Sequence, residues 1–530
     1  MKILGFHLSG DTLCNSDGES TKSNYLDFLL KYCDSDNVIR VAYNIDWMMA
    51  RLCYLLNIPE WQLKKFWGSS SLYWQGWQLF FVPHRYLGFK YGKHWGEANM
   101  SDIFQYDPTL PFDIDPMDAA LKAKEIGESV YSVLRKLDLN PKTLSSPVSA
   151  FQKEILSTID LPTLDDIPVE VRLHASECLH GGWQEIFRQG HFSESCFDYD
   201  LVSAYSRYTA DLIDHRYGTW FQSDKFYPSL PYGFCRGTVR IISDFSPIVY
   251  DAGGQQYTPV GEWETTLTSK QIKQLYDYGI GQFKMSSAWY WKPDKIVTPL
   301  KQEMETLFEW KAQLTGIERD IVKRLLVGIW GKTAEVFHDG EFGKLFNPVW
   351  AATIESSTRT QVADFILSNH AQDNLISIAV DGCLLDKKID IAETGEMGTW
   401  KLNNEAPAFV VSSGVGAIKG KASRGAFSLN YDWLAEQIAA NPDATEYTMV
   451  KTTPVTLGQA LKWGKLDKLG ELEQSERSVF IGIENKRLYK ESPVTGGDLL
   501  RQYHSDPLDV STLNKIVLED TSEIDINLTE

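Results

Sequence analysis

Short apolar segments alternate with amphipathic stretches at the start of the chain. The segments KILGFHL and NVIRVAY favour buried strands, whereas YLDFLLKYC and DWMMARLCYLL place apolar residues at helical spacing. Strands that alternate with helices are typical of an α/β unit. We therefore predict that the chain begins with an α/β domain.

The pattern changes at residues 141–170, where Pro, Ser and Asp accumulate, as is typical of a domain boundary. Beyond it, GTVRIIS and ESCFDYDLVSAY favour strands, residues 298–332 favour long helices broken at Thr315–Gly316, and YDWLAEQIAA favours a helix. The acidic end EDTSEIDINLTE favours a frayed tail. The whole pattern predicts a multidomain chain of mixed α/β and α+β type.

Composition narrows the class of protein. The chain has 530 residues, 43% of them hydrophobic and 23% charged, which excludes a disordered, collagen-like or coiled-coil chain. Its length predicts roughly two to four domains. The sequence has neither a long apolar run nor a signal-like start, so we expect no membrane insertion or export. The seven cysteines are scattered without a CxxC pair, which favours a reducing cytoplasm over a disulfide or zinc framework.

Net charge bears on nucleic-acid binding. The 52 basic and 71 acidic residues give −19, whereas nucleic-acid binders usually carry a basic surplus. Residues 451–490, however, hold eight Lys/Arg against five Asp/Glu, a local excess of three. The sequence therefore allows a basic groove on an acidic body.

Two aspartates are separated by a helical pattern rich in basic residues. Asp200 lies in a predicted strand, and Asp381 lies between two apolar arms, where Asp-Gly favours the tip of a β-hairpin. Each Asp alone is typical of a strand end or turn. Two carboxylates on adjacent strands, however, can hold Mg²⁺ ions for phosphoryl transfer, and the helix ERDIVKRLLVGIWGK can supply cations for a triphosphate. The combination predicts a nucleotidyl transferase.

The segments LHGGW at 179–183 and DLVSAY at 200–205 carry a family resemblance. They are similar to the YxGG element and to motif A, DxxSLYP, of type-B DNA polymerases, in the protein-primed branch of small phages and linear plasmids. The resemblance extends from about residue 171 to 400, with Ser206 in place of the motif A proline. It implies that Asp200 and the Leu201 carbonyl bind metal, and that Tyr205 lies under the nucleotide sugar and excludes a 2′-hydroxyl. The residues implied near template DNA are His180, Gly181 and Gly182.

The basic helix is similar to motif B, KxxxNSxYG, of the same family. Lys323 and Gly331 match, Trp330 supplies the aromatic residue, and Val327-Gly328 replaces Asn-Ser. Arg319 lies four residues before Lys323, so both can face the same phosphates. A solvated helix face is the alternative interpretation of these basic residues. The resemblance implies nucleotide binding by Lys323, Arg319, Trp330 and Lys311.

Three later segments extend the resemblance. SIAVDG aligns with motif C, YxDTDS, with Asp381 at the second aspartate and Ala379 at the first, which implies a metal ligand at Asp381. Gly398-Thr-Trp400 resembles a later element of the same branch. The segment at 485–489 is similar to the KKRY version of the primer-binding KxY motif, although basic strand ends are common. It implies DNA contacts from Lys486, Arg487 and Tyr489.

The resemblance implies an RNase H-like exonuclease-type domain followed by a right-hand polymerase with palm, fingers and thumb. The exonuclease DxE motif, however, falls on Phe6-His7-Leu8, and apolar groups cannot replace carboxylates as Mg²⁺ ligands. Only Tyr43-Asn44-Ile45-Asp46, and Asp115 or Asp118, are similar to the later exonuclease motifs. We expect an inactive exonuclease. The expected domains are exonuclease-like 1–170, palm 171–305 and 333–411, fingers 306–332, and thumb with acidic tail 412–530.

Residues 333–346 leave little room for the second insertion of the protein-primed branch. These 14 residues suffice for one hairpin with an Asp-Gly turn. In the family this insertion encircles DNA and supports processivity. We therefore expect a distributive polymerase, or one that needs a helper.

The resemblance thus implies a DNA-directed DNA polymerase that adds dNTPs to a primer 3′-hydroxyl, or to a protein hydroxyl at initiation. It implies two Mg²⁺ or Mn²⁺ ions, no proofreading, primer-template DNA and dNTPs as partners, and a terminal protein or processivity helper as further candidates. The expected location is the cytoplasm, that of the host if a phage encodes the chain. Two alternatives stay open. The altered motifs and the net charge indicate a pseudo-polymerase that binds nucleic acid, and the loss of Asn-Ser permits a template-independent terminal transferase.

Overall fold

The computed structural model forms two compact units. The first comprises Met1–Ile159, Thr306–Gly328 and Val450–Glu476, and the second comprises Asp160–Glu305, Ile329–Met449 and Arg477–Glu530. No helix of the described residues is long and apolar enough to cross a membrane. Three predicted features lie outside the residues that the structure describes: Cys33, Asp339 of the Asp-Gly turn, and the acidic tail at 519–530. The described residues are 1–32, 37–69, 71–82, 86–91, 100–102, 114–139, 141, 144, 146–337, 340–421, 429–455, 459–460, 463, 468, 472–482 and 484–514.

A mixed eight-stranded sheet forms the centre of the first unit, in the order β3-β2-β1-β4-β8-β7-β6-β5. Its strands are β1 (Lys2–Ser9), β2 (Thr12–Asn15), β3 (Ser20–Thr21), β4 (Val38–Ala42), β5 (Ser71–Trp74), β6 (Trp77–Val82), β7 (Tyr86–Tyr91) and β8 (Met100–Asp102). The helices are α1 (Tyr25–Leu30), α2 (Ile45–Leu55), α3 (Glu60–Ser69), α4 (Pro116–Lys136) and α5 (Pro147–Thr158). Both α2 and α4 contact β1, which explains why that strand is buried from Ile3 to Leu8. The predicted α/β start of the chain is confirmed.

A large antiparallel sheet positions the candidate site in the second unit. Its main order is β20-β19-β10-β18-β17-β9, and β24 pairs with both β10 and β23. Its strands are β9 (Gln184–Ile186), β10 (Arg188–Leu201), β17 (Leu375–Ala379), β18 (Gly382–Leu385), β19 (Trp400–Ser412), β20 (Val415–Ile418), β23 (Arg487–Tyr489) and β24 (Gln502–Pro507). A second sheet has the order β11-β16-β12-β15, with β11 (Gly218–Ser223), β12 (Tyr232–Ile241), β15 (Gly261–Thr268) and β16 (Gly281–Pro293). The hairpin of β13 (Tyr250–Ala252) with β14 (Gln255–Tyr257) also belongs to the second unit. A further hairpin, β21 (Glu446–Pro454) with β22 (Leu472–Phe480), has residues in both units.

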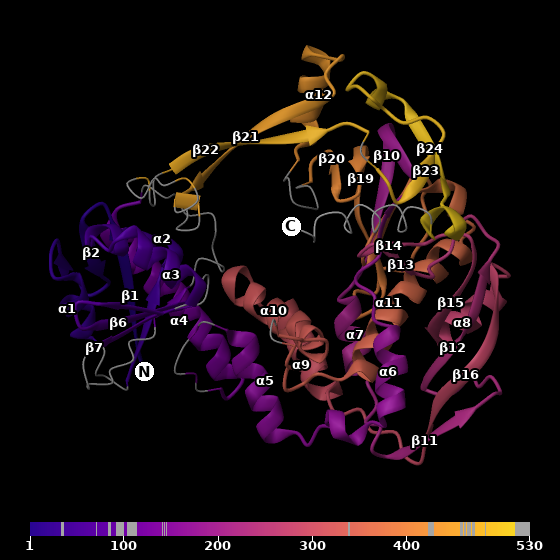
Figure 1. Ribbon diagram of the computed structural model, residues 1–530, viewed down its shortest axis with the longest axis horizontal. Helices are drawn as coiled ribbons and strands as arrows, with labels where there is room; N and C mark the ends of the chain where they lie inside the picture. Colours follow the sequence, from indigo (N-terminus) through magenta and orange to yellow (C-terminus); the bar gives the residue numbers. More distant parts are fainter. Residues whose placement is uncertain are drawn as a thin grey trace, which may run out of the picture. The chain divides into compact units, whose positions relative to one another are not determined.

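The helix α11 (Pro348–Ser368) forms much of the core of the second unit. It contacts the neighbouring helices α6 (Val169–Glu177) and α7 (Ala204–Ala210), which run beside it in Figure 1. Its buried residues cover all sides of the helix, so its sequence shows little amphipathic pattern. The same core includes side chains from both sheets of this unit. The remaining helices are α8 (Ser269–Asp277), α9 (Lys301–Gln313), α10 (Gly316–Thr333) and α12 (Tyr431–Ala440).

Most of the predicted elements beyond the boundary are confirmed. GTVRIIS forms the end of β12, α12 begins at Tyr431, and the long helices break between α9 and α10, where Gly316 has a φ of 54°. The short segment at 333–346 holds one antiparallel bridge, between Val336 and Phe342. The extension of the Asp200 strand to Tyr205 was wrong. That strand ends at Leu201, Ser203 has a φ of 51°, and α7 begins at Ala204.

Candidate active site

Asp200 and Asp381 come from neighbouring antiparallel strands. Asp200 lies opposite Gly382 in the pairing of β10 with β18, and the backbone N–H of Leu201 donates to the carbonyl oxygen of Asp381 at 3.0 Å. Asp381 occupies the turn between β17 and β18, so the predicted hairpin is confirmed. The two aspartates therefore lie at the same end of one sheet although 181 positions, 381 minus 200, separate them in the sequence.

Each of two aspartates on β10 has a lysine partner. Asp200 is 17% exposed, and its Oδ2 lies 3.4 Å from Nζ of Lys401, which stands opposite it on β19. Asp198 shares a strand face with Asp200 by its two-residue spacing. Its carboxylate is buried and forms an ion pair with Lys421. The first pair is more exposed to solvent than the second.

The hairpin tip that carries Asp381 has a strained backbone and is hydrogen-bonded to the segment that contains Trp183. Val380 has a φ of 63°, which is rare for a β-branched residue, and its N–H donates to the carbonyl oxygen of Trp183 at 2.7 Å. A Cβ at Gly182 would lie 2.9 Å from the Val380 side chain. Only glycine therefore allows this close approach. The segment predicted to contact template DNA supports the turn that positions Asp381.

Sequence reasoning missed a buried ion pair on α11. Glu355 and Arg359 lie 3.3 Å apart and are both buried. Glu355 accepts from the backbone N–H of His180 at 3.0 Å, and Arg359 donates to the carbonyl oxygen of Gly181 at 2.7 Å. Together Glu355 and Arg359, called the α11 clamp below, hold the loop that supports the hairpin tip. The available signal was a carboxylate and a guanidinium four residues apart in a helix whose one other charged residue is Asp364.

Burial sets the protonation behaviour of this clamp. Burial raises the pKa of Glu355 to about 7, although Arg359 and the His180 amide favour its charged form. Burial likewise lowers the pKa of Arg359, opposed by Glu355. On the other side of the loop, Nδ1 of His180 lies 2.9 Å from Oδ2 of Asp251. The loop is thus held by Glu355 and Arg359 of α11 and by Asp251.

Tyr205 projects from the first turn of α7, and its ring centroid lies 4.5 Å from that of Trp330. Burial raises the pKa of the phenol, and the charges of Glu355 and Asp381 raise it further. Tyr205 is therefore neutral at physiological pH. It can act by shape and hydrogen bonding, as a neutral ring close to the charges of the site.

The segment 398–400 fixes the chain that follows Asp200. The N–H of Gly398 donates to the carbonyl oxygen of Val202 at 2.7 Å, and Gln361 donates to the carbonyl oxygen of Gly398 at 2.6 Å. Gly398 has a φ of 78°. The Trp400 ring stacks on Phe365 at 4.1 Å between centroids. These contacts join the ends of β10 and β19 to α11.

The predicted triphosphate ligands lie on α9 and α10. Arg319 and Lys323 are exposed, and Nζ of Lys311 lies 5.1 Å from the Phe308 ring centroid. The altered motif B position Gly328 has a packing role, since a Cβ there would lie 2.6 Å from the side chain of Val148. These basic residues belong to the first unit, and Trp330, on the same helix, belongs to the second.

The predicted primer-binding residues contact β9. Arg487 forms a buried ion pair with Glu185 at 2.8 Å, so its guanidinium is neutralised inside the second unit. Lys486 donates to the carbonyl oxygen of Gln184 at 3.0 Å, and the Tyr489 hydroxyl donates to that of Ile186 at 3.0 Å. The three side chains together hold β23 against β9.

The exonuclease-like positions of the first unit are mostly structural. Phe6 and Leu8 are fully buried, and burial lowers the pKa of His7 to about 4, so this imidazole is neutral. The Asp115 side chain caps α4, and that of Asn44 caps α2. Tyr43 is buried, Asp118 is exposed, and the side chain of Asp46 lies outside the described part of the chain. Among the described residues, no three His, Cys, Asp or Glu side chains lie close enough to share a metal ion.

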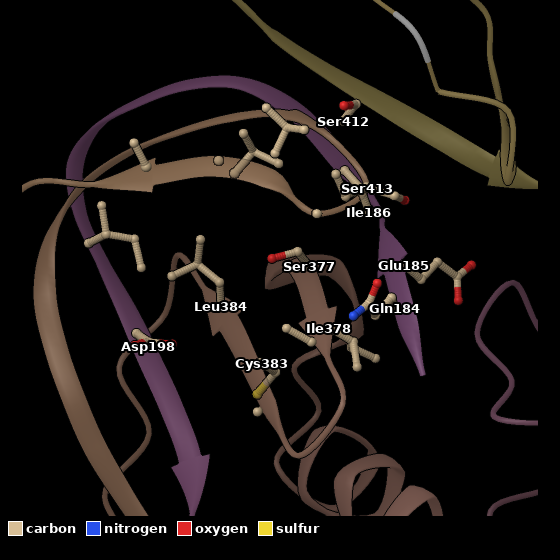
Figure 2. A pocket seen from close by; sticks show the side chains of 18 of the residues that line it. Gln184, Glu185, Ile186, Asp198, Ser377, Ile378, Cys383, Leu384, Ser412 and Ser413 are labelled. Atoms are coloured by element: carbon tan, nitrogen blue, oxygen red, sulfur yellow. The ribbon is translucent and has the colours of Figure 1, made fainter. Parts of the chain in front are cut away.

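A cavity of about 140 Å³ lies on the same sheet, lined by residues of β9, β10 and the strands β17 to β20. Figure 2 shows the side chains of Ile186, Ser377 and Leu384 around it, while the Glu185 carboxylate points away. The paired Asp198 and Lys421 also line it. Since Asp198 and Asp200 share a strand face, the candidate site continues into a mainly apolar hollow along this face of the sheet.

Comparisons with known proteins identify the fold. No protein-family model and no curated protein matches the sequence. The solved structure of phi29 DNA polymerase with primer-template DNA matches with a TM-score of 0.59 at 13% identity, over 91% of this chain and 100% of that chain. The same polymerase with primer-template DNA and incoming nucleotides matches with a TM-score of 0.59 at 12% identity, over 90% of this chain and 99% of that chain. The complex of that polymerase with single-stranded DNA matches with a TM-score of 0.57 at 12% identity, over 91% of this chain and 100% of that chain. The chain therefore has a polymerase-like fold, similar to that of phi29 DNA polymerase.

Proposed function

We propose that this chain is a DNA-directed DNA polymerase that extends a primer 3′-hydroxyl with dNTPs. The observation that carries the proposal is the position of Asp200 on β10 beside Asp381 in the turn between β17 and β18, at one end of a sheet. A carboxylate pair of this kind can hold the metal ions of phosphoryl transfer. The fold shared with phi29 DNA polymerase, solved with primer-template DNA, supports the same activity.

The ligand set fits Mg²⁺ or Mn²⁺. Both metals prefer oxygen ligands, and Mg²⁺ commonly binds one or two carboxylates and keeps water and substrate phosphates as its other ligands. Asp200 and Asp381 would hold two ions, with the Leu201 carbonyl as a further oxygen. When bound, the ions neutralise negative charge on the phosphoryl group that is transferred.

The basic face of α10 would bind the triphosphate. Spacings of four and seven residues place Arg319, Lys323 and Trp330 on one face of this helix. Arg319 and Lys323 would neutralise the β- and γ-phosphates as pyrophosphate leaves, and Lys311 would extend the cationic strip. Tyr205, packed against Trp330, would lie under the sugar and exclude a 2′-hydroxyl.

The proposed domains have separate tasks. Residues 1–170 would form an exonuclease-like domain without proofreading, 171–305 and 333–411 the palm, 306–332 the fingers, and 412–530 the thumb. The loop at 180–182 would contact the template strand, and the segment at 486–489 the primer. Initiation on a terminal protein belongs to the same proposal, through the resemblance to the protein-primed branch.

Primer extension with Mg²⁺ or Mn²⁺ tests the proposed polymerase activity. Wild type and Asp373→Asn, a control at an exposed site, should both extend a primer. Asp200→Asn and Asp381→Asn should lose extension, because each removes a carboxylate charge from the pair. Equal incorporation by wild type and Asp200→Asn would remove Asp200 from catalysis and contradict the proposal.

A second candidate is a pseudo-polymerase that binds DNA without turnover. It is favoured by the altered motif B, where Val327 is exposed and Gly328 serves helix packing. Failure of wild type to extend, combined with primed-DNA affinity that falls steeply with salt, would select this candidate. Extension products that ignore the sequence of a defined template would instead indicate a terminal transferase.

A further inference from the structure

The carboxylate of Asp200 has a cation beside it. Lys401 stands opposite Asp200 in the pairing of β10 with β19, and its Nζ lies 3.4 Å from Oδ2 of Asp200. The lysine side chain is 40% exposed and that of Asp200 is 17% exposed. The neighbouring pair of Asp198 and Lys421 is more deeply buried. Lys401 is therefore the more accessible of these two ammonium groups.

We infer that Lys401 is a built-in counter-cation that competes with the metal ion for Asp200. The inference rests on the proposed function. A divalent ion bound by Asp200 and an ammonium group at the same carboxylate repel each other. Because a lysine stem is long and flexible, the ammonium group can turn toward solvent when the ion binds. Metal binding therefore requires the Lys401–Asp200 pair to open.

This competition couples metal binding to nucleotide binding. Two ionised aspartates carry a charge of minus two, and Lys401 reduces this to minus one, so an isolated divalent ion is attracted less strongly. A triphosphate brings further negative charge and shifts the balance toward the metal. In the absence of nucleotide, Lys401 also offsets the repulsion between the two carboxylates.

Titration calorimetry with Mg²⁺ alone, without DNA or nucleotide, tests the inference. Lys401→Gln should bind Mg²⁺ at this site about fivefold more tightly than wild type, the factor expected for loss of a partly exposed ion pair. Lys401→Arg keeps the charge and should bind like wild type. Lys388→Gln is the matched control, since it removes the same charge from a lysine paired with Glu405 on β19. Asp200→Asn identifies the heat that belongs to this site.

Unchanged or weaker Mg²⁺ affinity in Lys401→Gln would overturn the inference. A rise in KM for dNTPs with unchanged metal affinity would also overturn it, because it would assign Lys401 to the triphosphate. Primer extension separates this failure from failure of the proposed function. Equal extension by wild type and Asp200→Asn rejects the polymerase. Loss of extension in Asp200→Asn, with no metal effect in Lys401→Gln, rejects only the role of Lys401.

Discussion

Replacing Glu355 by glutamine should change how the stability of the second unit depends on pH. Burial raises the pKa of Glu355 from its ordinary value of 4.5 to about 7 in the folded protein. The folded state therefore binds this proton more tightly than the unfolded state between those two values. By linkage, the contribution of Glu355 to the free energy of unfolding falls as pH rises through this interval and levels off above it.

The size of the effect follows from the shift. The contribution of Glu355 to the free energy of unfolding should fall on the order of 3 kcal/mol between about pH 4.5 and pH 7, since one pKa unit corresponds to about 1.4 kcal/mol. Glutamine retains an acceptor oxygen for the His180 amide and does not titrate, so this contribution to the slope disappears in Glu355→Gln. The variant also leaves Arg359 without its counter-ion, which changes the absolute stability. The slope is therefore the quantity to compare.

Thermal unfolding between pH 5 and pH 8 measures that slope in wild type, Glu355→Gln and the exposed control Glu436→Gln. Hydrogen exchange of the peptide that contains residues 179–183 gives a local readout, because the His180 amide donates to Glu355. Burial lowers the pKa of His215 to about 4, which adds a slope of opposite sign in all three proteins. The stability of wild type and of Glu436→Gln should therefore fall relative to that of Glu355→Gln as pH rises. Parallel profiles for all three proteins would refute the assignment of the raised pKa to Glu355.

Three further substitutions test the geometry of the site. Tyr205→Ala should relax rejection of rNTPs in single-nucleotide incorporation, and unchanged rejection would restrict this ring to packing. Lys323→Ala should raise KM for dNTPs and leave primer affinity unchanged. The control Lys301→Ala, at another exposed lysine, should leave KM unchanged. An equal change in KM for both variants would contradict triphosphate binding by Lys323. Gly182→Ala should lower kcat, because its Cβ would lie 2.9 Å from the valine at the hairpin tip, while Gly181→Ala meets its nearest atom at 3.8 Å. Equal kcat for these two glycine variants would contradict support of the tip by this loop.

Elements set by local patterns could be predicted from the sequence. The hairpin around Asp381 follows from two apolar arms and an Asp-Gly pair, and the break before α10 follows from a glycine that adopts positive φ. The end of β10 was harder to predict, because apolar residues continue past Leu201. The strand stops where Ser203 adopts a left-handed conformation, which the residue type alone did not indicate.

The clamp on α11 depends on contacts that no local pattern describes. Glu355 and Arg359 bind a loop at His180 and Gly181, 175 to 178 residues earlier in the chain. α11 is buried all round, so its polar positions do not separate into a solvent face. The position of Lys401 depends likewise on the register of β10 with β19. That register includes an irregularity between Asp198 and Tyr199, which a period-two pattern does not contain.

The role of a basic residue is set by whether the fold brings an acid to it. Lys323 and Arg487 look alike in the sequence, as cations in segments that resemble polymerase motifs. Arg487 is buried against Glu185, which lies 302 residues earlier, and its guanidinium also lies 4.3 Å from the Phe187 ring centroid. Lys323 is exposed on α10. Because a buried charge stays where it is paired, phosphate binding should depend more strongly on Lys323 than on Arg487.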